Sequence, residues 1–97
     1  MTPLAFHSAA RLELRESVEY YNQRRPGLGE DFLAEAERVL ERLTAHPLQG
    51  HPLSDTVRKM RISRFPYDVV YRIEKERVLV VAVMHHRRRP AYWNDRL

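Results

Sequence analysis

The stretch that decides the fold is residues 78–84, which read Val-Leu-Val-Val-Ala-Val-Met. A short run of β-branched and other apolar residues between polar segments predicts a β-strand that is buried on both faces. A strand with one face in water would instead alternate between apolar and polar residues. We therefore expect cover on both faces. Helices can supply one cover, and the other must come from the C-terminal tail, a partner chain, or both.

Two further strands are predicted before this one, because apolar residues recur there with a period of two. In residues 57–62, Met60 and Ile62 alternate with Lys59 and Arg61, which indicates one buried face and one wet, cationic face. After the Phe65-Pro66-Tyr67 bend, residues 68–74 form the next strand, and a tight polar turn at 74–77 leads into 78–84. One face of the middle strand carries Val69, Tyr71 and Ile73, and the other carries Val70 and Arg72.

The first half of the chain predicts an antiparallel pair of helices. Residues 9–25 carry an apolar stripe at helical spacing, with Ser8 as the expected N-cap, and Pro26-Gly27 ends this helix. A second amphipathic helix runs from residue 28 to His46-Pro47. With a short extended piece at residues 2–6, the fold class is α+β in the order β-α-α-β-β-β. We expect the helical hairpin to pack on a small antiparallel sheet, followed by a short C-terminal tail or helix.

Composition limits the chemistry that is available. The 97 residues fit one domain, residues 1–97, and the absence of cysteine excludes disulfides, thiolate catalysis and cysteine zinc sites. The histidines show no ligand spacing, so we expect neither a metal nor a cofactor. We see no signal peptide and no membrane-spanning run, and we expect a cytoplasmic protein. The net charge of +4 favours an acidic partner.

The densest functional signal is His85-His86-Arg87-Arg88-Arg89, at the end of the strand that decides the fold. In a three-stranded meander this end lies beside the start of the preceding strand, so its cations can join Lys59 and Arg61 in one patch. Such a patch can neutralise phosphates or stabilise the charge that develops in phosphodiester cleavage. The alternative is a solvated arginine cluster that pairs with carboxylates of the helices. Glu13, Glu16 and Glu19 are themselves expected to form a solvated helix face.

Several motifs, taken in order, are similar to one known family. They are Ala10-x-x-Glu13-Leu14 with Tyr20-Tyr21, Gly29-x-x-Phe32, His46-Pro47, Val57-Arg58, Arg64-Phe65-Pro66-Tyr67-x-Val69-Val70-Tyr71-Arg72-Ile73, and the ending from Val81 to Arg89-Pro90-x-Tyr92-Trp93. Along nearly its whole length the chain resembles the RelE/ParE superfamily of bacterial type II toxins. The resemblance implies a toxin that forms a hetero-oligomer with a cognate antitoxin, whose extended segment wraps it.

The superfamily contains two activities. ParE-like members poison DNA gyrase, and the Phe65-Pro66-Tyr67 bend and the Arg89-Pro90-x-Tyr92-Trp93 ending favour that branch. RelE-like members cleave messenger RNA on the ribosome. A third reading is an inactive module that only holds a partner.

The resemblance assigns three sets of candidate residues. The catalytic set, which applies only to a ribonuclease, is Lys59, Arg61, His85, Arg87 and Tyr92. The target-binding or nucleic-acid-binding set is Arg58, Arg64, His86, Arg88, Arg89 and Trp93. The antitoxin-binding set is Leu12, Tyr20, Val70 and Arg72.

Overall fold

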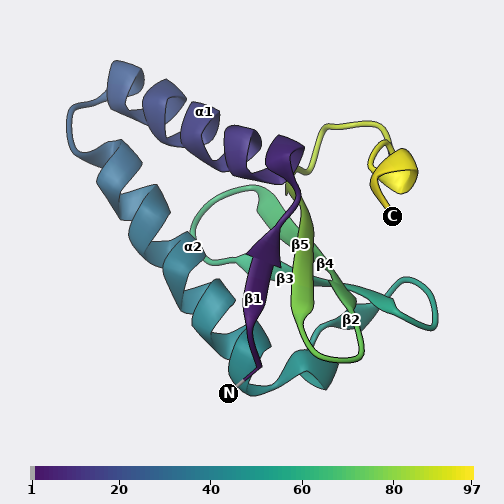
Figure 1. Cartoon of the computed structure of the whole chain (residues 1–97). Coiled ribbons are helices and arrows are strands. Elements are labelled where there is room, and N and C mark those ends of the chain that lie inside the picture. The colour runs from purple at the N-terminus through teal and green to yellow at the C-terminus, as the bar shows by residue number, and fades with distance from the viewer. Residues whose placement is uncertain (1) are drawn as a thin grey trace.

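The computed structural model describes residues 2–97 and has an α+β fold (Figure 1). In chain order the elements are β1 (Leu4–Phe6), α1 (Ser8–Arg24), α2 (Leu28–Ala45), β2 (His51–Pro52), β3 (Val57–Ile62), β4 (Tyr67–Ile73) and β5 (Val78–His85). Short 3-10 turns follow α2 and β5, at Pro47–Gln49 and Asn94–Arg96. The strands form one sheet in the order β1-β5-β4-β3-β2, so β5 has a strand on each side. The predicted fold class is confirmed.

The sheet is mixed, which the sequence did not indicate. β3, β4 and β5 form the expected antiparallel meander, but β1 pairs with β5 in parallel, with Leu4 opposite Val78 and Phe6 opposite Val80. The long connection that a parallel pair requires is supplied by both helices together with β2, β3 and β4. The segment expected to be an open loop also contains a strand, because His51 and Pro52 pair with β3 as β2. A proline is tolerated there because β2 lies at the edge of the sheet.

The start of α1 differs from the prediction by one residue. His7, rather than Ser8, is the N-cap, and its Nδ1 accepts a hydrogen bond from the backbone N–H of Ala9 at 3.1 Å. At the start of α2, the amide oxygen of Asn22 accepts from the N–H groups of Gly27 and Gly29. A Cβ at Gly29 would lie 2.3 Å from the carbonyl oxygen of Val18, so the close approach of the two helices requires glycine there.

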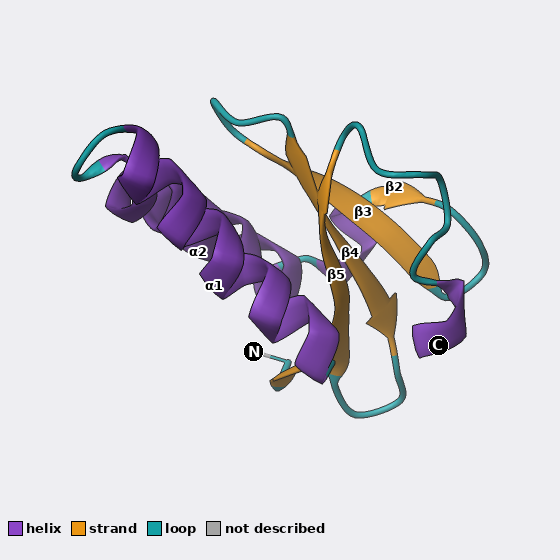
Figure 2. Ribbon diagram, turned by 90° about the horizontal axis from the view of Figure 1, so that it is seen from above, coloured by secondary structure: helices purple, strands orange, loops and turns teal. Residues whose placement is uncertain are grey.

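One hydrophobic core fills the space between the helices and the sheet. Both helices lie on the same side of the sheet, as the view from above shows (Figure 2). Phe32 is fully buried at the centre of an aromatic cluster, with its ring 5.1 Å from Phe65, 4.9 Å from Tyr67 and 5.3 Å from Tyr21. The bend at residues 65–67 therefore closes the end of the core.

A second, smaller core lies on the opposite face of the sheet, which we call the second face. Trp93, in the C-terminal tail, packs there in one buried cluster with residues from three strands, namely Val57, Val70, Leu79, Val81 and Ala82. The tail therefore covers part of the second face, as one of the alternatives predicted. A β-bulge in the β4–β5 ladder, where Val70 pairs with Ala82 and Tyr71 with Val80, turns both Val81 and Ala82 toward the tail.

We predict that Phe32→Ala lowers the free energy of unfolding by about 3–5 kcal/mol, because it leaves a cavity among packed rings. Leu12→Ala is the matched control, since Leu12 is 44% exposed, and it should change stability by less than about 0.5 kcal/mol. Urea unfolding followed by circular dichroism measures both. Equal stabilities for the two variants would place the core elsewhere.

Candidate functional site

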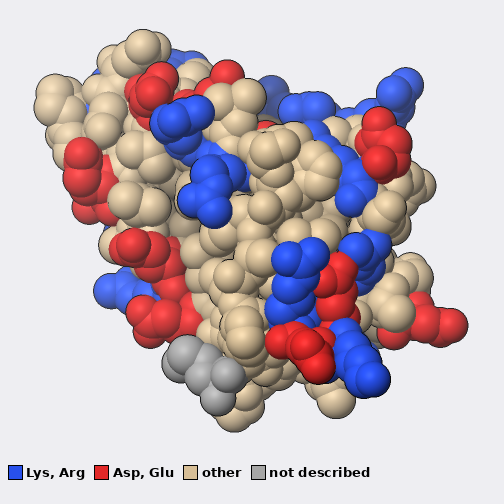
Figure 3. Space-filling model, viewed as in Figure 1, with Lys and Arg blue, Asp and Glu red and all other residues tan. Residues whose placement is uncertain are grey.

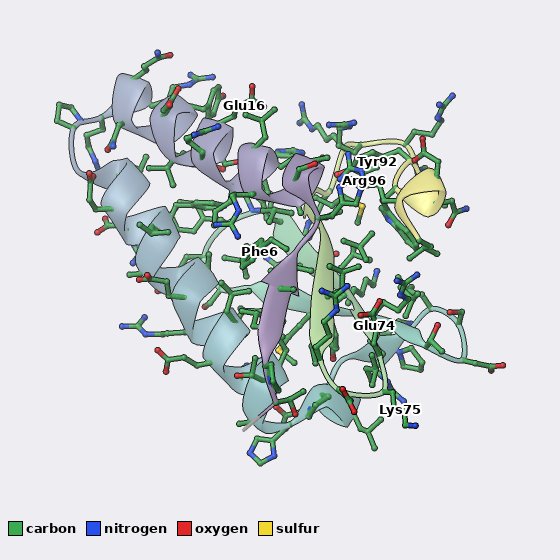
Figure 4. All side chains as sticks on the ribbon, in the orientation of Figure 1. Phe6, Glu16, Glu74, Lys75, Tyr92 and Arg96 are labelled. Atoms are coloured by element: carbon green, nitrogen blue, oxygen red, sulfur yellow. The ribbon has the colours of Figure 1, made fainter. Side chains whose placement is uncertain are left out.

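The tail is fixed by one carboxylate, that of Glu13 on α1. Its Oε2 accepts hydrogen bonds from the Tyr92 hydroxyl at 2.9 Å and from Nη2 of Arg96 at 3.0 Å. Its Oε1 accepts from Nη1 of Arg96 and from the backbone N–H of Val83, both at 3.0 Å. We call these four residues the Glu13 cluster. Figure 4 shows Tyr92 and Arg96 together beside α1, with Glu16 directed away from them.

The Glu13 cluster also closes an unpaired sheet edge. The register of β1 ends at Phe6 and Val80, so β5 continues past it. There, Glu13 accepts from the N–H of Val83, and Arg96 donates to the carbonyl oxygen of Val81 at 3.1 Å. An ion pair of side chains thus supplies the hydrogen bonds that a neighbouring strand would make.

The cluster keeps Tyr92 in its neutral, donating form. Burial first, and then the hydrogen bond to Glu13, raise the pKa of Tyr92 well above its ordinary value. The hydrogen bonds to Glu13 are also the main reason that the pKa of Arg96 is raised. A tyrosine held in this way has a structural role in joining the tail to α1.

An open groove crosses the second face beside the tail. Its cationic half, a cleft of about 510 Å³, is lined by Lys59 and Arg61 of β3 and by His86 and Arg88 after β5. The buried carboxylate of Asp68 lies among them, 3.2 Å from Nε2 of His86 and 3.9 Å from Nζ of Lys59. The predicted meeting of the β3 cations with the segment after β5 is therefore confirmed.

The apolar half of the groove is a cleft of about 410 Å³ that continues from the first, since both are lined by Lys59, Met84 and Pro90. Its other walls include Leu53 of the β2–β3 connection and Trp93 and Leu97 of the tail. We call the two halves together the second-face groove. On the face that Figure 3 shows, the edge over α2 is mostly acidic, while most lysine and arginine side chains lie over α1, the sheet and the tail.

The residues predicted to form a ribonuclease set are not brought together. Lys59 and Arg61 line the second-face groove, but His85 lies on the helix side of the sheet, where its ring is 5.0 Å from that of Tyr67. Burial first, and then the neighbouring Arg87, lower the pKa of His85. Tyr92 is held by Glu13. Arg87 is exposed, and its backbone N–H donates to Nδ1 of His85.

The predicted target-binding set is also divided. His86 and Arg88 line the groove, and Arg89 is exposed beside it in sequence. The other three members make structural contacts. Arg58 donates to the carbonyl oxygens of Leu48 and Gly50, and Arg64 lies 3.6 Å from the Glu35 carboxylate. Trp93 lines the apolar half of the groove but is only 6% exposed.

Among the predicted antitoxin-binding residues, Leu12 and Tyr20 are exposed on α1. Val70 is fully buried in the second core, so a partner cannot reach it while the tail is docked. Arg72 is half-buried and pairs with Glu74. Of the four residues, Leu12 and Tyr20 are therefore the most accessible to a partner.

Two important residues were missed by sequence reasoning. Glu13 was expected on a solvated face, and this was wrong, because only the folded tail brings Tyr92 and Arg96 to it. Asp68 received no role, although an aspartate inside an apolar strand, directly opposite Arg61, was a readable signal.

Within residues 2–97, no group of three histidine, aspartate or glutamate side chains is arranged to hold a metal ion. No helix of this region is long and apolar enough to cross a membrane.

Comparison with known proteins gives the family. The sequence matches the family described as "ParE toxin of type II toxin-antitoxin system, parDE" over residues 4–90. A solved structure titled "Chromosomal ParDE TA system from P. aeruginosa" shares the fold, with a TM-score of 0.76, 16% identity, and coverage of 88% of this chain and 96% of that one. No curated protein matches the sequence. The family match shows a toxin of the RelE/ParE superfamily, and the chain belongs to the ParE toxin family of type II toxin–antitoxin systems.

We predict that Glu13→Gln destabilises the protein by about 3 kcal/mol, because it leaves the largely buried Arg96 guanidinium without its counter-charge. The emission of Trp93, the only tryptophan, should shift to the red as the tail loosens. Glu16→Gln, one turn further along α1 and exposed, is the control and should leave both readouts unchanged. Unfolding with fluorescence detection measures both. An unchanged midpoint for Glu13→Gln would contradict the role assigned to the cluster.

Proposed function

We propose that this toxin poisons DNA gyrase in the cytoplasm and is neutralised by a cognate antitoxin. Membership of the ParE toxin family supports the proposal. The observation that carries the choice of target is the division of the ribonuclease set across the two faces of the sheet, with His85 on one face and Lys59 and Arg61 on the other. Residues that cannot meet one scissile bond do not form an RNA-cleaving site. A groove on the face of a β-sheet suits a toxin that acts by binding a protein target.

The antitoxin surface is proposed on the helical side. Leu12 and Tyr20 lie exposed two turns apart on α1. On another side of α1, an apolar hollow of about 400 Å³ lies between the helices, lined by Leu14, Val18 and Leu33 and bordered by Arg11, Arg15 and Glu19. An amphipathic antitoxin helix with acidic flanks would bury apolar residues there and pair with these arginines.

A second candidate function is ribosome-dependent mRNA cleavage. The observation that favours it is the pair of His86 and Asp68, in which a carboxylate 3.2 Å from Nε2 orients an imidazole beside Lys59, Arg61 and Arg88. Such an imidazole can serve as a general acid or base. This arrangement would use His86 in place of the predicted His85.

The gyrase proposal is tested with purified, folded protein in a supercoiling assay on relaxed plasmid. We expect inhibition of supercoiling and trapped double-strand breaks, both prevented by the antitoxin. Folded protein that leaves gyrase unaffected and cleaves mRNA on ribosomes would establish the second candidate. Folded protein that neither acts in these assays nor arrests growth would be an inactive binding module.

The antitoxin surface is tested by Leu12→Asp combined with Tyr20→Ala. Because both side chains are exposed, we expect normal folding, normal gyrase inhibition, and at least about tenfold weaker antitoxin binding in calorimetry. Leu48→Asp is the matched control, since Leu48 is 72% exposed on a different part of the surface. Unchanged antitoxin affinity in the double variant would exclude this face of α1.

A further inference from the structure

We infer that the second-face groove binds an acidic and apolar segment of the toxin's protein target. The inference rests on the proposed function, which makes that target gyrase. The groove has two unlike halves that share Lys59, Met84 and Pro90. One half is cationic and the other is apolar, so a bound segment must offer a carboxylate to the first and an apolar side chain to the second.

In the cationic half, arginine side chains are more available to a ligand than lysine or histidine side chains. Asp68 lies close to Lys59 and His86, and its carboxylate partly neutralises Lys59. Arg61 and Arg88 are exposed, and the Arg88 guanidinium carbon lies 3.9 Å from the centre of the Tyr92 ring. Stacking on a ring that Glu13 holds in place fixes the direction of Arg88 in advance. A preorganised guanidinium favours planar, bidentate binding of a carboxylate.

In the isolated chain, the apolar half leaves hydrophobic side chains exposed and one polar group without a hydrogen-bond partner. Leu53 and Leu97 leave 41% and 47% of their surfaces exposed at its walls. The indole Nε1–H of Trp93, which also lines this half, is buried without a hydrogen-bond acceptor within residues 2–97. A buried unpaired donor is costly and uncommon. A carbonyl oxygen from a docked segment can accept this hydrogen bond after a small shift of the tail.

The same features disfavour nucleic acid as the occupant. The Asp68 carboxylate lies among the cations and lowers their net positive charge, which weakens the binding of a polyanionic backbone more than that of a single carboxylate. Single-stranded nucleic acids also bind by stacking bases on exposed aromatic rings, but the aromatic residue of this groove, Trp93, is buried. The apolar walls have no counterpart on a sugar-phosphate backbone. A protein segment satisfies both halves.

The test combines one variant in each half, Arg61→Gln with Leu97→Asp. The first removes an exposed cation from the cationic half, and the second places a negative charge in the wall of the apolar half. The control is Lys75→Gln with Leu48→Asp, which makes the same chemical changes at exposed positions that do not line the groove. Both proteins should unfold near the wild-type midpoint. We expect the groove variant to need at least about tenfold more protein for half-inhibition of gyrase, and the control to match wild type.

Binding of a partner to the groove is measured directly by a signal from Trp93. Protein labelled with 5-fluorotryptophan gives one ¹⁹F resonance, because Trp93 is the only tryptophan. We expect unlabelled gyrase to shift or broaden this resonance in wild type and control, and not in the groove variant. A single-stranded RNA oligonucleotide and a duplex DNA, each at physiological salt, are the comparison probes and should leave it unchanged.

The outcomes separate the two proposals. If wild type inhibits gyrase and the groove variant inhibits it equally well, the inference is wrong and the proposed function stands. If folded wild-type protein does not affect gyrase, the proposed function is wrong. The groove is then tested by comparing growth arrest in cells that express the wild type and the groove variant. If the groove variant still arrests growth, the inference is wrong. If the variant no longer arrests growth and nucleic acid causes no ¹⁹F response, the groove binds a protein target other than gyrase, which supports the inference. A ¹⁹F response to RNA or DNA overturns it.

Discussion

The structure depends on a single carboxylate, that of Glu13 on α1, which accepts four hydrogen bonds from three residues in two other parts of the chain, β5 and the tail. It holds the tail through Tyr92 and Arg96 and closes the edge of β5 through Val83. The two ions are largely withdrawn from water, so their attraction is screened less than that of a surface pair. The cost of their desolvation is offset because each charge has several hydrogen-bonding partners.

The position of the tail determines the second face of the sheet. With the tail docked, Trp93 completes a second core and, with Leu97, forms a wall of the second-face groove. The groove is therefore formed by the folded tail as well as by the sheet. The helical side remains separate and carries the exposed Leu12 and Tyr20. These two distinct surfaces correspond to the two faces that we propose for the target and for the antitoxin.

The fold was largely readable from the sequence, and the site was readable only in part. Apolar residues on both faces of 78–84 correctly required a second cover, and the alternation in 57–62 correctly placed Lys59 and Arg61 on one face. The β-bulge at Val81 was not predictable, because it changes which side chains share a face without changing composition. Glu13 resembled Glu16 and Glu19 in sequence, since its partners are 70 to 83 residues away. His85 and His86 were separated by the alternation of side chains along a strand.

The central claim is that the C-terminal tail packs on the second face and builds the groove. The most direct measurement is a nuclear Overhauser spectrum of the methyl-labelled protein that observes the indole protons of Trp93. The account predicts cross-peaks to the methyl groups of Val57, Val70 and Val81, with which Trp93 shares the second core. Indole protons at solvent-exposed chemical shifts, with no cross-peaks to these strands, would contradict it.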